Sequence, residues 1–440
     1  PTAIETEAWT QVADVVCSGI VCAGVVRSAS AGMLGPAVVE PPAAAPTGGV
    51  QTMWVWGDNT RGVTAQGTVQ GMTMLPTGVT TTERLVDYAF TLTHGVGLGE
   101  SGTLYGVGEV GTGKNGLVGS GTVSVLTRVV DGLYGLRARS VAVCKNAMAV
   151  VLEDGGLYTA GDNYYSGQGT TSGYTRTLRR VDFATWLPAP AAATGIKRVM
   201  SGTDVMYIEL NDGSLYVIGV LGPRALTGDG ASSTYATRPM RVDMSKWVPA
   251  VAAGVRVSSI ACGDTNVAVV MTDGTVYTAG SGAVGSGSSV TGRLCYQGAT
   301  QSIPRRVDMN TSYPVPMAGA RIVSAAIGTY HTVLVEAGGG VYACGDNTYG
   351  QGGQRDTGYV LQVPTLVDAR TYQPTGSAGL KAVSVTATGS TTLVTMDNGR
   401  VYGMGAQTGY VQGTGLQTGN VMVPTAIETE AWTQVADVVC

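Results

Sequence analysis

Residues 326–345 read AIGTYHTVLVEAGGGVYACG, and this stretch decides the fold. Apolar and polar residues alternate in two short runs separated by a glycine-rich turn, and the second run ends at Gly345. Alternation interrupted in this way predicts a β-hairpin. The closing phrase occurs seven times, as MWVWG (53–57), TLYGVG (103–108), GLYTAG (156–161), SLYVIG (214–219), TVYTAG (275–280), GVYACG (340–345) and RVYGMG (400–405).

Each phrase belongs to a larger repeating unit. The closing glycines are 51 to 65 residues apart. Within a unit we expect a hairpin with a two-residue turn such as Asp-Gly, then a Gly-rich loop, then a short strand such as RRVD (179–182). Each unit therefore offers about four strands, which is the content of one β-propeller blade.

The Gly-rich loops carry a family resemblance. GDNTRG (57–62), GDNYYSGQG (161–169) and GDNTYGQGG (345–353) resemble the regulator of chromosome condensation repeat, whose unit ends in Gly-x-Asn-x-x-Gly-Gln-Leu-Gly. IGTYHT (327–332) fits the first half of that unit, and His94 takes the equivalent place in the second unit. The resemblance implies a seven-bladed β-propeller, and the seven units agree with it.

We therefore predict an all-β fold, a seven-bladed β-propeller of four-stranded antiparallel blades. A single domain spans residues 1–440, and its ring is closed by joining the N- and C-terminal segments. The core hairpins are expected near 12–57, 86–108, 140–161, 197–219, 256–280, 321–345 and 381–405.

Composition excludes several classes of function. The formal net charge is −4, and lysines and arginines form no cluster, so the chain lacks the electrostatic footprint of a nucleic-acid-binding protein. No apolar run approaches the length needed to span a bilayer, so we expect no membrane insertion. The seven cysteines form no CxxC pair, and we interpret them as small buried hydrophobic residues rather than a disulfide framework or metal site.

The two ends of the chain are identical, because residues 424–440 repeat residues 1–17. A closed ring has places for one copy only: VPTAI (423–427) aligns with the last strand of a blade, and QVADVVC with the first strand of the next. Three interpretations are open. The second copy is an overlap left where a closed ring is cut open, or the sign of tandem propellers in a longer chain, or a spare strand that inserts into a neighbouring molecule.

Four loops between blades place an aromatic residue before a proline. Regular recurrence favours packing of the blade-to-blade crossover, whereas the alternative is an aromatic binding rim for a protein or a sugar. The Pro/Ala-rich insertion 27–49 in the first unit breaks the symmetry and is a further candidate contact. The candidate partner-binding residues are Trp186, Trp247, Tyr313, Tyr372, Pro41 and Pro42.

The remaining conspicuous residues are interpreted as structural. The asparagines of the Gly-Asp-Asn loops are expected to bond backbone groups, and isolated aspartates there lack the spacing of a calcium site. Two histidines at equivalent positions indicate a repeated structural hydrogen bond, and they are too few for a catalytic set. The structural residues are Gly57, Asn59, Gly161, Asn163, Gly345, Asn347, His94 and His331, and we expect no catalytic residue, metal or cofactor.

These observations favour a non-catalytic protein-interaction or structural scaffold that presents loops to protein partners, copies of itself included. A Gly/Thr/Ala/Val-rich composition poor in Lys and Phe suggests a bacterial surface or phage virion component, hence an extracellular or virion-associated location. One alternative is a guanine-nucleotide exchange factor for a small GTPase, the activity of the founding member of the family that the repeats resemble. Another is a carbohydrate-binding propeller.

Overall fold

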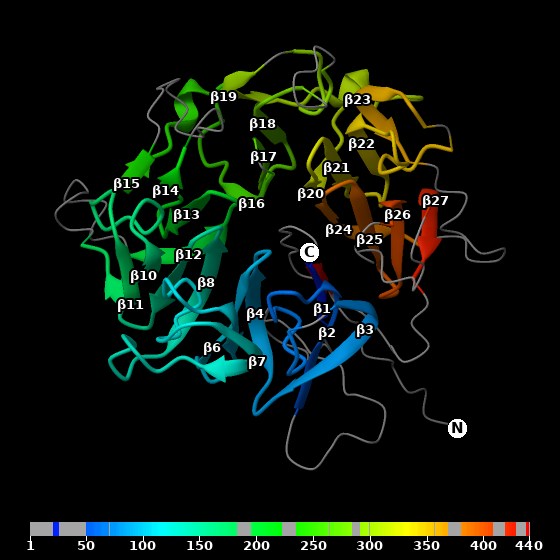
Figure 1. The fold of residues 1–440 in the computed structure, drawn as a ribbon. Helices are drawn as coiled ribbons and strands as arrows, with labels where there is room; N and C mark the ends of the chain where they lie inside the picture. The colour runs from blue at the N-terminus through cyan, green and yellow to red at the C-terminus, as the bar shows by residue number, and fades with distance from the viewer. Residues whose placement is uncertain are drawn as a thin grey trace, which may run out of the picture.

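The computed structural model describes residues 21–25, 50–69, 71–182, 195–221, 235–263, 265–283, 291–298, 300–355, 357–367, 380–407, 419–427 and 437–439. These residues form seven four-stranded antiparallel sheets, which are arranged radially around a central axis (Figure 1). The predicted seven-bladed β-propeller is confirmed. In blades 2 to 7 the first strand along the chain lies nearest the axis, and the fourth lies at the rim (Figure 1).

Blades 2 to 4 each use four consecutive strands. Blade 2 contains β4 (Leu85–Phe90), β5 (His94–Gly99), β6 (Leu104–Glu109) and β7 (Thr122–Arg128). Blade 3 contains β8 (Ala138–Cys144), β9 (Ala147–Leu152), β10 (Leu157–Asp162) and β11 (Tyr174–Arg180). Blade 4 contains β12 (Ile196–Ser201), β13 (Val205–Leu210), β14 (Leu215–Val220) and β15 (Tyr235–Arg241).

Blades 5 to 7 follow the same pattern. Blade 5 contains β16 (Val257–Cys262), β17 (Asn266–Met271), β18 (Val276–Gly280) and β19 (Gln301–Arg306). Blade 6 contains β20 (Ile322–Ile327), β21 (His331–Glu336), β22 (Val341–Asp346) and β23 (Val360–Leu366). Blade 7 contains β24 (Ala382–Thr388), β25 (Thr391–Met396), β26 (Val401–Ala406) and β27 (Asn420–Ala426). Two 3₁₀ helices, η2 (Met244–Lys246) and η3 (Met309–Thr311), lie in the crossovers after blades 4 and 5.

Blade 1 takes its strands from both ends of the chain. Its order from the axis outward is β28 (Asp437–Val439), β1 (Val21–Val25), β2 (Val50–Asp58) and β3 (Met72–Thr81). The C-terminal copy of the duplicated segment thus provides the inner strand of blade 1, and its residues 424–426 end the outer strand of blade 7. The N-terminal copy and the insertion 27–49 lie outside the described residues.

The closing glycines have a geometric cause. At Gly161 and Gly345 the backbone has φ of +116° and +96°, which L-residues with a side chain rarely adopt. A Cβ at these glycines would lie 2.3 Å from the carbonyl oxygen of Asn146 and 2.4 Å from that of Tyr330. The pairing with the outer strand shifts register at the same point, which is a β-bulge. Repetition of this bulge explains why each unit closes on glycine.

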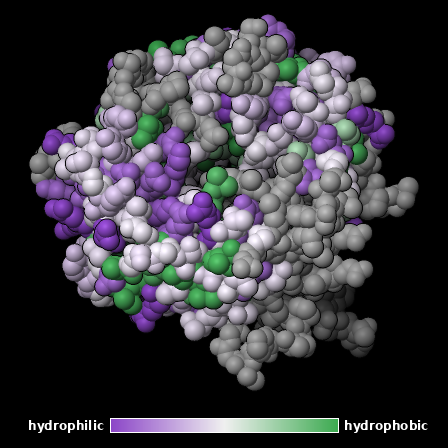
Figure 2. Space-filling view, viewed as in Figure 1, coloured by the Kyte–Doolittle hydropathy of each residue, from purple (hydrophilic) through white to green (hydrophobic). Residues whose placement is uncertain are grey.

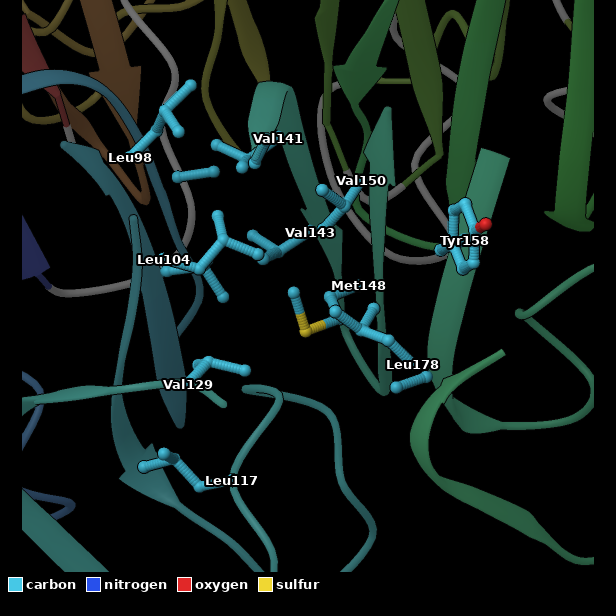
Figure 3. Packing of buried hydrophobic residues seen from close by; sticks show 14 of the residues in the cluster. Leu98, Leu104, Leu117, Val129, Val141, Val143, Met148, Val150, Tyr158 and Leu178 are labelled. Atoms are coloured by element: carbon cyan, nitrogen blue, oxygen red, sulfur yellow. The ribbon is translucent and has the colours of Figure 1, made fainter. Parts of the chain in front are cut away.

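Apolar residues on both faces of each blade pack against the neighbouring blades. Between blades 2 and 3, Leu98 and Leu104 face Val141, Val143 and Met148 (Figure 3). All five are at most 5% exposed, and burial of aliphatic side chains stabilises by roughly 1.5 to 3 kcal/mol each. The core is therefore a ring of layers between blades, with no single centre.

The turns between second and third strands differ from the prediction. The amide of Gly155 donates to the carbonyl of Leu152, and the amide of Leu152 donates to the carbonyl of Gly156 over 3.1 Å. Three residues therefore form this loop, where the sequence analysis expected two. Gly155, at φ +77°, ends a turn that leaves the preceding Asp154 free to accept from the amide of Gly156.

The interpretation of the cysteines was wrong for one pair. Cys295 and Cys344 form a disulfide between the loop that follows β18 in blade 5 and strand β22 in blade 6. Cys144 is buried, as expected for a small hydrophobic residue. The part of the chain that the structure describes contains no helix long and apolar enough to cross a membrane.

Candidate interaction surfaces

Two faces of the disc carry different loops. Because the four strands of a blade alternate in direction, the loops after the first and third strands share one face, and the loops after the second and fourth strands share the other. The first face, here called the glycine-loop face, contains the Gly-Asp-Asn loops. The second, here called the crossover face, contains the Asp-Gly turns and the connections between blades.

The Gly-Asp-Asn loops bond to themselves and to the next blade. The Asn59 amide donates to the carbonyl of Thr68, the Asn163 amide to that of Ser172, and the Asn347 oxygen accepts from the amide of Gly352. Next to them, the carboxylates of Asp58, Asp162 and Asp346 each accept a backbone amide two residues on.

Glycines in these loops and in the equivalent loop of blade 2 touch the backbone of the next blade. A Cβ at Gly113 would lie 2.4 Å from the carbonyl oxygen of Arg176, and one at Gly350 would lie 2.7 Å from the Cα of Met422. These contacts give the loops a packing role. Across the described residues, no three His, Cys, Asp or Glu side chains gather as a metal site would require.

Both histidines are completely buried. His331 Nε2 lies 2.8 Å from the hydroxyl of Thr392 in blade 7, and that hydroxyl donates to the carbonyl of Gln351. His331 therefore donates to Thr392, and the chain of bonds links blades 6 and 7. Burial, together with the nearby charge of Arg293, lowers the pKa of His331 to about 3.

His94 is held differently. Its Nδ1 lies 2.7 Å from the hydroxyl of Thr91 in its own blade, so the hydrogen bond is not the one that His331 makes. Burial, with Lys114 nearby, lowers the pKa of His94 well below its ordinary value. Both rings are neutral and enclosed, which is unlike an accessible general base.

The aromatic-proline loops do not form one equivalent set. Trp247 is 2% exposed and packs on Tyr277 with ring centroids 5.1 Å apart. Tyr313 lies one position further along its loop, and 64% of it is exposed. The residue that aligns with Trp247 is Ser312, so grouping Tyr313 with Trp247 is corrected. Trp186, Tyr372, Pro41 and Pro42 lie outside the described residues.

The crossovers after blades 4 and 5 also cover sheet edges. Val248 donates to the carbonyl of Pro304 and accepts from Arg306, and Tyr313 makes the same two bonds with Pro364 and Leu366. The backbone of each crossover thereby adds a short parallel bridge to the outer strand of the following blade. This use of the backbone leaves the side chain of Tyr313 exposed on the crossover face.

The inner strands of blades 2 to 7 line a central channel. Figure 2 shows the face hollowed near its centre, where these strands converge. One part of the lining is mainly apolar and includes Phe90, Val143 and Ile327, and another includes the polar side chains of Ser140 and Arg198. The channel thus changes from apolar to polar between its two described parts.

Arg198 is ion-paired with a carboxylate within the fold. Its Nε donates to Glu209 over 2.6 Å, and Lys197 donates to the other carboxylate oxygen over 2.9 Å. Glu209 itself is fully buried, and a second guanidinium nitrogen of Arg198 bonds the carbonyl of Ser258 in blade 5 over 2.7 Å. A buried carboxylate needs such partners, so this group fastens blade 4 to blade 5.

An aromatic cluster on the glycine-loop face was missed by the sequence analysis. Tyr164 of blade 3 and Tyr235 of blade 4 have ring centroids 4.9 Å apart. Tyr235 is 42% exposed, and Tyr174 at the start of β11 is 55% exposed. The doubled tyrosine in GDNYYSGQG was the available signal, but the partner ring lies 71 residues further along the chain. We call Tyr164, Tyr174 and Tyr235 the tyrosine cluster.

The fold and the loops together define an RCC1-like seven-bladed β-propeller, and comparison with known proteins agrees. Residues 322–351 match the Regulator of chromosome condensation (RCC1) repeat. The resemblance seen in the sequence is therefore confirmed.

Two solved structures share the fold. Human WBSCR16 has a TM-score of 0.66 at 16% identity, over 86% of this chain and 94% of that one. Prp20p from Saccharomyces cerevisiae, described with its binding properties to Gsp1p and histones, has a TM-score of 0.67 at 16% identity, over 89% and 87%. At this identity the likeness shows the fold alone.

Curated relatives match over shorter stretches. Protein pim1 of Schizosaccharomyces pombe is 30% identical over 154 residues, which are 34% of this chain and 25% of pim1. E3 ubiquitin-protein ligase HERC2 of Mus musculus is 26% identical over 279 residues, which are 63% of this chain and 5% of HERC2. The chain thus spans a quarter or less of the length of these relatives.

Proposed function

We propose that the protein is a non-catalytic interaction scaffold whose glycine-loop face binds a protein partner. The observation that carries this proposal is the tyrosine cluster. Tyrosine gives large contact area at low cost in conformational entropy, and it is enriched at interfaces. Two rings from separate blades, with a third on the same face, break the symmetry of the repeat, as a specific binding surface requires.

The interior supports the same proposal. The buried His331 and His94 are neutral, and the buried Glu209 is paired with Lys197 and Arg198. These groups serve the blade seams. Binding of proteins is also what is described for the structural relative Prp20p, which suits a propeller that presents loops to another macromolecule. An extracellular or virion-associated location stays a prediction.

The test sets the tyrosine cluster against the crossover face. We would compare wild type, Y164A/Y235A and Y313A by native affinity purification from the source cells, with cross-linking and quantitative mass spectrometry. We expect the amount of partner that co-purifies with the double variant to fall at least about tenfold. Truncation of central aromatic residues in an interface commonly costs about 2 kcal/mol or more of binding free energy. Y313A, which removes an even more exposed tyrosine on the other face, should retain it. Loss in Y313A alone would place binding on the crossover face.

Two further assays address the alternatives. Accelerated release of labelled GDP from a small GTPase would identify a guanine-nucleotide exchange factor, an activity suggested by the repeat family. Binding on a glycan array that disappears in Y164A/Y235A would identify a carbohydrate-binding propeller. A negative result in both assays, with partner loss in the double variant, supports the scaffold.

A further inference from the structure

One position of the inner strands places a series of polar residues around the central channel. In blades 2 to 6 this position comes directly after the irregularity in the pairing of the first two strands. The residues there are Asp87, Ser140, Arg198, Ser259 and Ser324. All five line one cavity of about 150 Å³ in the polar part of the channel. Because the repeat brings these side chains to one level, their charges and hydrogen bonds decide what the cavity can hold.

Two seams use the serine at this position to join neighbouring blades. Ser140 accepts from the amide of Val199 in blade 4 over 3.1 Å, and Ser324 accepts from the amide of Val385 in blade 7 over 3.3 Å. These amides therefore point away from their own hairpins, as those of alternate residues in an edge strand do. Each amide belongs to the residue directly after the polar position.

The seam between blades 5 and 6 lacks this bond. Ser259 is partly exposed, and its hydroxyl has no hydrogen-bond partner among the described residues. Across the seam, Ala325 has the register position of Val199 and Val385, so its amide points the same way. Ser259 and Ala325 both line the cavity. A hydroxyl and an amide there are therefore available to donate to a ligand.

Arg198 brings a positive charge to the same side of the cavity. Its Nε donates to Glu209, which also accepts from Lys197, so two cations share one carboxylate and one positive charge remains. Its Nη2 donates to two carbonyls of blade 5, whereas Nη1 has no partner in the part of the chain that the structure describes. The side chain is 27% exposed and lines the cavity, so Nη1 is placed to donate to a bound anion.

The blade 2 side of the cavity carries the opposite charge. Asp87 lies on β4, two blades away from Arg198, and lines the same cavity. One of its carboxylate oxygens accepts from the amide of Tyr88 over 2.9 Å. A carboxylate has about four acceptor positions, so it can accept from a ligand in addition to its bonds within the fold. The cavity is therefore dipolar, with donors and positive charge on blades 4 to 6 and a carboxylate on blade 2.

We propose that this cavity binds a small zwitterion, a free amino acid of the size of glycine, alanine or serine. Its carboxylate accepts from Arg198 Nη1, the Ser259 hydroxyl and the Ala325 amide, and its ammonium group donates to Asp87. The volume sets the size, because an apolar cavity of about 150 Å³ takes benzene, a ligand of about six non-hydrogen atoms. Asp87 disfavours a simple anion and Arg198 disfavours a simple cation, so a ligand with both charges complements the cavity best.

Ligands that keep only one charge test the dipolar arrangement. Ligand-observed NMR titrations of the full chain would compare L-alanine with propionate, which lacks the ammonium group, and with ethylamine, which lacks the carboxylate. We expect alanine to bind and each analogue to bind at least about tenfold more weakly, because each leaves one charged group of the cavity unpaired. Absence of binding for glycine, alanine and serine alike at millimolar concentration would overturn the proposal. Propionate that binds as tightly as alanine would do so too.

Two variants assign the ends of the ligand. D87N removes a charge with almost no change in shape, and it should weaken alanine at least about tenfold without weakening propionate. S259A should weaken alanine and propionate alike, by about fivefold, and leave the melting temperature unchanged because the hydroxyl makes no bond within the described residues. S302A removes an exposed serine of β19 at the rim and is the matched control, which should bind alanine as wild type does.

The variants also contain the contradicting results. Unchanged affinity of D87N for alanine would show that the ammonium group is not held at Asp87. Equal losses in S259A and S302A would place binding outside the channel. Circular dichroism verifies that each variant is folded. If D87N does not fold, the analogue series on wild type and the comparison of S259A with S302A still decide, because neither alters a charged group.

Discussion

The seam between blades 5 and 6 and the seam between blades 7 and 1 join their blades in different ways. At the first, the Arg293 guanidinium lies over the ring of Tyr330, 5.4 Å from its centroid, and Thr332 donates to the Arg293 carbonyl over 2.7 Å. The Cys295–Cys344 disulfide then links the blades covalently. At the second, β28 comes from the C-terminal end of the chain and lies against β24, where the buried hydroxyls of Ser384, Thr386 and Thr388 have no partner among the described residues.

The difference teaches that each blade of the continuous chain is fastened by the loop of the blade before it. The loop after the third strand of blade 5 carries both Arg293 and Cys295, and it packs on blade 6 through Gly292, where a Cβ would lie 2.7 Å from the Leu361 carbonyl. The closing seam depends on backbone pairing of a strand from a distant part of the sequence. We therefore expect the seam between blades 5 and 6 to resist unfolding more strongly than the seam between blades 7 and 1.

The largest expected effect is loss of the disulfide. Cys295 and Cys344 are 49 residues apart, and a cross-link over that separation stabilises by about 4 kcal/mol through restriction of the unfolded chain. C295S/C344S should lower the free energy of unfolding by about that amount in urea titrations. The control is reductant, which should destabilise wild type and leave the variant unchanged. Equal reductant sensitivity of both proteins would show that the bond adds nothing.

The next effect is a loss of stability in acid at the seam of blades 6 and 7. The folded state keeps His331 neutral down to about pH 3, whereas the unfolded chain protonates it below its ordinary value of 6.5. Stability is therefore complete above pH 6.5 and falls by up to about 1.4 kcal/mol per pH unit below it. H331Q should have a shallower slope between pH 6.5 and 4. His94 remains in both proteins and shifts both curves equally, so parallel slopes would disprove the assignment.

Local pattern made the blades predictable, because alternation, turns and the closing glycines are each set within about 20 residues. The bulge at Gly345 needs only the approach of the Tyr330 carbonyl, 15 positions earlier. Contacts between blades were harder to predict. Cys295 adopts φ +65° in a loop that is longer than the equivalent loops of the other units. Because of this extra length, the spacing of the cysteines in the sequence did not indicate that Cys295 pairs with Cys344. Tyr164 and Tyr235 meet only once two blades pack together.

In the crossovers, a shift of one position along the loop decides whether the aromatic side chain is buried or exposed. Trp247 and Tyr313 both precede a proline closely, but the intervening Val248 moves Trp247 one position back along the loop. That position points into the core, and the next one points outward along an edge-covering strand. Residue type cannot distinguish the buried Trp247 from the exposed Tyr313, because both side chains are aromatic and both loops bond the following blade. Only the register of the bridge assigns one to packing and the other to the surface.

The smallest effect compares equivalent serines at three seams between blades. S140A should cost about 1 kcal/mol, because it removes the bond to the Val199 amide between blades 3 and 4. S324A should cost about as much, because Ser324 accepts from the amide of Val385 over 3.3 Å between blades 6 and 7. S384A should cost least, because the Ser384 hydroxyl, which faces the closing seam, has no partner among the described residues. Urea titrations of the three variants measure these differences. A loss in S384A equal to that in S140A would show that the Ser384 hydroxyl also bonds across its seam, and the closing seam would then resemble the others.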